Sequence, residues 1–131
     1  MSFASRLEQA SRSAPEPELR TWAAELEHRW HAELLPHFAV EERLWLPALT
    51  TAGLGDLTWQ TAIEHRTLAA LMANRELPLR EKLLRFGALL HAHVRFEERE
   101  LFQAAQRALA ESELAALADA MADQGAPRSV L

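Results

Sequence analysis

The hydrophobic positions of the chain recur at helical spacing over nearly its whole length. A clear example is the stripe formed by Trp22, Leu26, Trp30 and Leu34, whose members are four residues apart. Residues three or four apart share one side of an α-helix, so this pattern predicts amphipathic helices. Stretches rich in proline, glycine and asparagine interrupt the pattern between these helices. The predicted helices span residues 2–12, 18–49, 56–74, 79–109 and 112–124.

This order of helices predicts an all-α protein, an up-down four-helix bundle with a short C-terminal helix. Pro36 lies inside the longest helix and removes one backbone donor, so we expect a kink there. The length of 131 residues fits one domain. We assign residues 1–124 to the helical bundle and residues 125–131 to a flexible tail.

Composition narrows the range of functions. The net charge is −5, whereas a nucleic-acid partner would favour a basic surface. No apolar run approaches the roughly 20 residues needed to span a bilayer, and no signal-peptide pattern opens the chain, so we expect a cytoplasmic protein with no membrane partner. The absence of cysteine excludes disulfides, thiolate metal sites and cysteine nucleophiles. Redox or ligand chemistry must therefore rest on histidine and carboxylate side chains.

The pattern His-x-x-x-Glu-Glu-Arg occurs twice, beginning at His37 and at His93. Residues four apart lie about 40° from each other around a helix, so His37 shares a face with Glu41, and His93 shares one with Glu97. Both pairs fall in apolar stripes, where a carboxylate is costly to bury without a partner. Two such faces turned toward each other would join two imidazoles and two carboxylates, a ligand set that suits iron or another transition metal.

His65 is a third candidate ligand, because it lies in line with the apolar residues Leu68, Ala69 and Met72. For any single buried histidine the alternative is a core residue that is hydrogen-bonded to a carboxylate. The matched repeat favours a metal site over that alternative. We predict no catalytic residue and the following metal ligands: His37, Glu41, His65, His93 and Glu97.

The remaining histidines and the second glutamate of each repeat are expected to point elsewhere. Glu42 and Glu98 lie about 100° around the helix from the predicted ligands, which favours salt bridges with nearby arginines or support of the ligands from outside. His28, His31 and His91 also lie off the ligand face. We expect these three histidines at the surface or the flank of the bundle.

Taken together, the motifs resemble a known family, the hemerythrin-like or HHE cation-binding domain. They are His37-x-x-x-Glu41-Glu42-x-x-x-Leu46-Pro47, Glu64-His65 and His93-x-x-x-Glu97-Glu98-x-x-Leu101-Phe102. The resemblance extends over roughly residues 1–122. It implies a four-helix bundle that holds a non-haem di-iron centre. Glu41 and Glu97 would then be bridging carboxylates, with His37, His65 and His93 as terminal ligands.

Two positions depart from the pattern of the family. Its first helix usually carries a histidine, whereas this chain begins at Met-Ser-Phe-Ala-Ser-Arg-Leu, so we expect a truncated first helix that lacks that ligand. Oxygen-carrying hemerythrins also place a histidine where Ala69 stands here. Water or a carboxylate of Glu42, Glu64 or Glu98 could fill the gaps, and a single metal ion or a metal-free bundle are the alternatives. The groove beside a short first helix predicts a homo-oligomer.

Three functions follow from this sequence. The first is a non-enzymatic iron protein that binds or senses O2, NO, peroxide or iron itself. The second is a di-iron enzyme that reduces peroxide or NO, or oxidises Fe(II). The third is a metal-free structural or interaction bundle. The matched His-Glu repeat with His65 favours the first, with a small diatomic molecule or peroxide as the partner.

Overall fold

A computed structural model describes residues 2–125 as helices joined by short turns, with no β-strand among these residues. The all-α fold is therefore confirmed. Of the predicted tail, residues 126–131 lie outside the described part of the chain. The helices are α1 (Phe3–Ser13), α2 (Glu16–Arg29), α3 (Leu35–Val40), α4 (Leu46–Thr51), α5 (Gly55–Ala73), α6 (Leu79–Phe96), α7 (Phe102–Ala108) and α8 (Glu111–Asp123).

Two long helical rods form the frame of the bundle. One contains α2, α3 and α4, and the other contains α6 and α7. Within each rod the helices are joined by π-helical turns, in which a backbone N–H bonds to the carbonyl five residues earlier. These turns are Trp30–Leu34, Glu41–Trp45 and Glu97–Leu101. The predicted helices 18–49 and 79–109 are confirmed as continuous rods, but their widened turns were not predicted.

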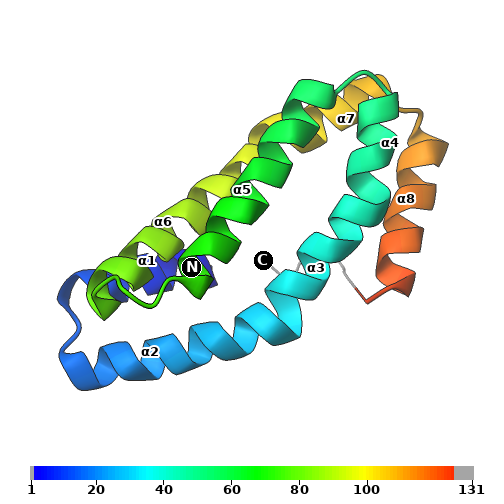
Figure 1. Ribbon diagram of the computed structural model, residues 1–131. Coiled ribbons are helices and arrows are strands. Elements are labelled where there is room, and N and C mark those ends of the chain that lie inside the picture. Colours follow the sequence, from blue (N-terminus) through cyan, green and yellow to red (C-terminus); the bar gives the residue numbers. More distant parts are fainter. Residues whose placement is uncertain (1, 126–131) are drawn as a thin grey trace.

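Prolines follow two of the three π turns. The N–H of Leu35, just before Pro36, bonds to the carbonyl of Trp30, and the residue before Pro47 makes the equivalent bond to Glu41. Prolines and π turns both bend helices. Figure 1 shows α2 running at an angle to α3 and α4, so the kink predicted near Pro36 is present and coincides with the turn before it.

The two short helices cover different parts of the bundle. Helix α1 packs against α6, and α8 packs against the turn Glu41–Trp45 (Figure 1). The approach of α1 is close at Gly87, where an added Cβ would lie 2.8 Å from the backbone nitrogen of Glu8. A side chain larger than hydrogen at this position would push the two helices apart.

Two hydrophobic clusters fill the interior. The first contains Phe38, Leu68 and Leu90, and the second contains Val40 and Phe96. The first rod passes from the first cluster to the second between Phe38 and Val40. The second rod does so between Leu90 and Phe96. The buried ionisable residues at this passage form what we call the polar layer: His37, Glu41, His65, His93 and Glu97.

None of the described helices is both long and apolar enough to cross a membrane. The expected self-association of the chain stays a prediction.

Candidate metal centre

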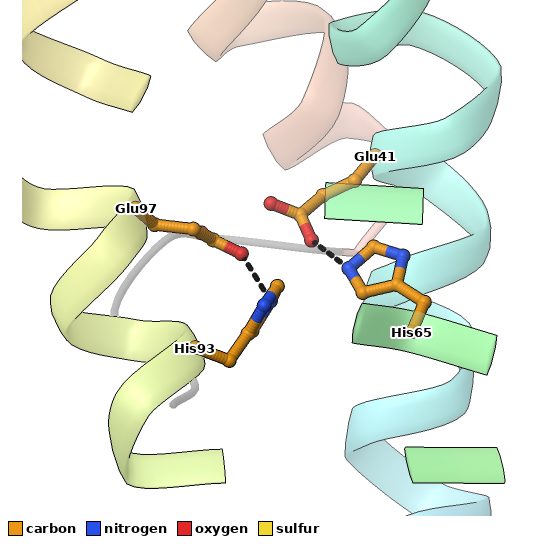
Figure 2. Close-up of side chains that lie close together, drawn as sticks. All are labelled: Glu41, His65, His93 and Glu97. Atoms are coloured by element: carbon orange, nitrogen blue, oxygen red, sulfur yellow. Dashed lines mark ion pairs between the residues drawn. The ribbon is translucent and has the colours of Figure 1, made fainter. Parts of the chain in front are cut away.

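Four side chains of the polar layer converge on one point (Figure 2). Glu41 is the first residue of the π turn after α3, and Glu97 is the first residue of the π turn after α6. His65 comes from α5 and His93 from α6. One donor atom from each of the four residues lies within 4.8 Å of the donor atoms of the others.

Each carboxylate of this group faces an imidazole nitrogen. Oε1 of Glu41 lies 3.3 Å from Nε2 of His65, and Oε1 of Glu97 lies 2.5 Å from Nε2 of His93 (Figure 2). His37 is also buried, and its Nε2 lies 3.7 Å from the same Glu41 oxygen. The structure therefore brings four of the five predicted ligands into one compact group and places the fifth beside it.

The group contains an unusual concentration of unsatisfied polar atoms. Five buried atoms of the polar layer make no hydrogen bond, although all but the first face an oppositely charged or titratable group: Nδ1 of His37, Oε1 of Glu41, Nε2 of His65, Nε2 of His93 and Oε1 of Glu97. Buried polar atoms are nearly always paired, so orphans that gather at one place indicate a missing partner. Lone pairs of nitrogen and oxygen that converge within a few ångströms are compatible with binding a cation.

Two further carboxylates hold the imidazole rings from behind. Oε2 of Glu42 lies 3.2 Å from Nδ1 of His65, and Oε1 of Glu64 lies 2.6 Å from Nδ1 of His93. A carboxylate that accepts from Nδ1–H fixes the tautomer that leaves the Nε2 lone pair free for a metal. The expected supporting role of Glu42 fits this contact. Glu64 takes the same role, whereas from the sequence it was considered only as a carboxylate that could complete the metal coordination.

Phe38 is a functional neighbour that the sequence motifs did not single out. Its ring stacks on His65 with centroids 4.0 Å apart, and it meets His93 edge-on at 5.5 Å. Aromatic packing of this kind restricts how the imidazoles rotate. The sequence feature that could have identified Phe38 is its position directly after His37, on the helix that leads into the turn with Glu41.

The repeat in the sequence is also a repeat in the backbone. The N–H of Leu46 bonds to the carbonyl of Glu41, and the N–H of Phe102 bonds to the carbonyl of Glu97, each across a π turn. No proline follows the second of these turns, so a proline is not required to open it. Widened turns occur frequently at functional sites. Two of the three π turns that the structure describes, Glu41–Trp45 and Glu97–Leu101, begin at a carboxylate of the candidate centre.

The electrostatics of the group favour a positive charge at its middle. Burial raises the pKa of Glu41 well above its ordinary value, and the nearby Glu97 carboxylate raises it further. Burial lowers the pKa of His37, and it lowers the pKa of His65 to about 3, helped by His93. These two histidines therefore stay neutral, which is the form that binds a metal.

His93 behaves in the opposite way to the other two histidines. Burial works to lower its pKa, but the carboxylates of Glu64 and Glu97 outweigh burial and raise it to about 9. The same contact, together with Gln60, outweighs burial at Glu64 and lowers the pKa of that carboxyl. Without a metal, a proton on His93 thus supplies the positive charge that the two carboxylates attract.

The residues expected outside the site are found there. Glu98, His28 and His31 are exposed, and His91 is half-buried on α6, away from the group of four. Ala69 is partly buried against the first hydrophobic cluster.

Comparison with known proteins shows which family the chain matches. A family model described as "Hemerythrin HHE cation binding domain" matches residues 2–105 of the chain, which includes every residue of the polar layer. No curated protein and no solved structure matched the chain.

Proposed function

The chain belongs to the hemerythrin HHE cation-binding family, and on that premise we propose that the polar layer holds non-haem iron. The observation that supports the proposal is the group of four buried side chains, Glu41, His65, His93 and Glu97, whose donor atoms converge from the two helical rods and α5 and make no hydrogen bond. Histidine and carboxylate donors without any thiolate suit iron among the abundant transition metals.

We propose two iron ions per chain. The support is the number and kind of the donors: two carboxylates can each bridge a pair of ions, and three histidines can complete the coordination. Glu41 and Glu97 would be the bridging groups, and His37, His65 and His93 the terminal ones. The 3.7 Å contact of His37 with Glu41 puts its imidazole within reach of a second ion beside the group of four.

We propose that the iron centre binds or senses O2, NO or peroxide, because iron with an open coordination position takes up such small molecules. The protein groups around the centre serve this purpose in three ways. Glu42 and Glu64 orient the imidazoles, and Phe38 packs against them. The two hydrophobic clusters on either side of the polar layer keep bulk water away.

The first experiment measures how much iron binds. Purified full-length protein is loaded anaerobically with Fe(II), freed of excess metal and analysed for iron per chain. We expect about two ions for the native protein and for Glu98→Gln, which changes an exposed residue next to the site, and a clear loss for Glu97→Gln. One ion per native chain would replace the di-iron proposal by a single-ion site. Iron bound equally by Glu97→Gln and the native protein would contradict the site.

The second experiment separates a binding protein from an enzyme. Iron-loaded protein is mixed with O2, NO or peroxide, and the visible absorption spectrum and the concentration of the small molecule are followed together. If the protein only binds the small molecule, the absorption change is stoichiometric with the bound iron, and no more of the small molecule is consumed afterwards. Repeated turnover of peroxide or NO, lost in Glu97→Gln but kept in Glu98→Gln, would assign the enzymatic alternative instead.

A further inference from the structure

The side chains of the polar layer are closed off from solvent. Their exposed fractions range from 1% at Glu41 and His93 to 5% at His65. A metal ion or a small molecule from solution therefore reaches them only when some part of the chain moves. Elements that open locally are the least stable ones, which have few buried apolar contacts. Helix α8 is such an element.

Helix α8 covers the layer on the side of Glu41. It packs against the π turn Glu41–Trp45 (Figure 1). A cavity of about 230 Å³ lies between them, and its lining includes both ends of that turn together with Leu114, Ala118 and Met121 of α8. If α8 moved away, the turn, and with it Glu41, would be exposed to solvent.

Few apolar contacts hold α8 in place. Within Glu111–Asp123, which the structure describes in full, Met121 alone is buried. Leu114 and Leu117 are only partly buried against the second hydrophobic cluster. By contrast, α5 and α6 bury residues along their whole length. Opening α8 therefore exposes much less apolar surface than moving either of the other helices would.

Both ends of α8 suit a hinged movement. At its start, Leu109 and Ala110 join it to α7 with extended backbone, at φ angles of −114° and −67°. Changes of φ and ψ at a few linking residues can rotate a whole element. Just after its end, Gln124 accepts a hydrogen bond from the Arg43 guanidinium, and both of these residues are exposed. Such a bond holds the helix weakly, because water can replace either partner.

We propose that α8 is a lid on the candidate metal centre, which opens by rotation at Leu109 and Ala110 and gives metal ions and small molecules access to Glu41. Helix α8 begins at residue 111, beyond the 2–105 segment that the family model matches, so the lid belongs to this chain rather than to the family pattern. The passage of iron past the lid rests on the proposed function, whereas the opening itself requires no metal.

The first test follows hydrogen exchange of backbone amides in metal-depleted, full-length protein. Since α8 opens without the rod beside it, its slowest amides should exchange several-fold faster than the slowest amides of α7. Met121→Ala removes the buried side chain of the lid, so the amides of α8 should exchange roughly 10-fold faster still, or more.

Met72→Ala is the matched control for this substitution. Met72 is buried to a similar extent as Met121, with 8% against 5% exposed, but it belongs to the first hydrophobic cluster. Its loss destabilises the closed and the open lid equally, so the exchange of α8 should not change. The lid is overturned if the amides of α8 exchange no faster than those of α7, or if the two variants change the exchange of α8 alike.

The second test holds the lid shut. The chain has no cysteine, and the side chains of Arg43 and Gln124 meet, so the double variant Arg43→Cys, Gln124→Cys can be joined by a short bis-maleimide. This variant is loaded anaerobically with Fe(II) and divided, and one half is cross-linked. Release of Fe(II) to an excess of a ferrous chelator is then timed for both halves.

We expect the cross-link to slow the release of Fe(II) several-fold without changing how much Fe(II) the protein holds beforehand. Met121→Ala should speed the release, whereas Met72→Ala should not. Equal release rates with and without the cross-link would overturn the lid as the route to the centre. A protein that takes up no Fe(II) would instead refute the proposed function, and hydrogen exchange would still decide whether α8 opens.

Discussion

At the scale of single residues, His93 and His65 differ in charge because their partners differ: His93 is protonated and His65 is neutral. His93 lies between the carboxylates of Glu64 and Glu97, at 2.6 and 2.5 Å. His65 instead has Nδ1 against Glu42, which is exposed to solvent, and its ring is stacked on Phe38. In the metal-free protein the proton on His93 therefore takes the place of the cation.

This proton makes the stability of the metal-free protein depend on pH. The pKa of His93 is about 9 in the folded state and 6.5 as its ordinary value, so the folded state binds the proton more tightly. The resulting stabilisation is complete below pH 6.5 and is lost as the pH rises toward 9, by at most about 1.4 kcal/mol per pH unit. Urea unfolding of metal-depleted protein across this window measures it.

The matched variant for that experiment is His93→Gln. It keeps a polar side chain of similar reach but cannot be protonated, so its stability should fall less between pH 6.5 and pH 9. If native protein and variant lose the same free energy over this range, the raised pKa of His93 is not the cause.

Removing the support behind an imidazole should weaken metal binding without removing a ligand. In Glu64→Gln the amide is a poorer acceptor for Nδ1–H of His93, so we expect the affinity for Fe(II) to fall about 10- to 100-fold. Competition with a chelator under anaerobic conditions measures the change. Glu98→Gln makes the same chemical change at an exposed position and should bind Fe(II) like the native protein. Equal losses in both variants would refute a specific role for Glu64.

At the scale of the helical elements, the buried group of histidines and glutamates could be predicted from the sequence, but the π turns that carry its carboxylates could not. His37 and Glu41 could be recognised because ionisable groups inside an apolar stripe are costly unless they bind something. The π turns leave no such mark, since Pro47 follows one of them and no proline follows its counterpart at Glu97–Leu101. The role of Glu64 also depended on how α5 packs against α6, which periodicity does not reveal.

The close contact between α1 and α6 depends on glycine at position 87, which has no side chain. A Cβ on Gly87 would lie 2.8 Å from the backbone nitrogen of Glu8, so α1 would have to move. We expect Gly87→Ala to reduce the free energy of unfolding by about 1–3 kcal/mol, even though alanine favours helix. Gly55→Ala is the control, because a Cβ there meets nothing within 4 Å, and it should be neutral or slightly stabilising. Chemical denaturation of both variants measures the difference, and equal stabilities would contradict the close packing of α1.

At the scale of the whole molecule, the polar layer should make folding sensitive to metal. Fe(II) that binds the folded chain alone stabilises it, by about 2.7 kcal/mol when its concentration is 100 times the dissociation constant. We expect anaerobic Fe(II) to raise the Tm of the native protein and of Glu98→Gln. Glu41→Gln, which removes a buried carboxylate of the layer, should show little or no rise. A Tm that does not change with Fe(II) in the native protein would favour the metal-free bundle.

The position of the polar layer between two hydrophobic clusters also has a consequence for how the chain opens. Each cluster is a candidate cooperative unit. The layer between them consists of ionisable side chains, so apolar packing does not join the two clusters there. In the metal-depleted protein, backbone amides of α4, α7 and α8 should exchange their hydrogens through smaller openings than those of α6 beneath α1. A bound ion with ligands from both rods and from α5 would link the two clusters across this layer, so the two halves would then unfold as one cooperative unit.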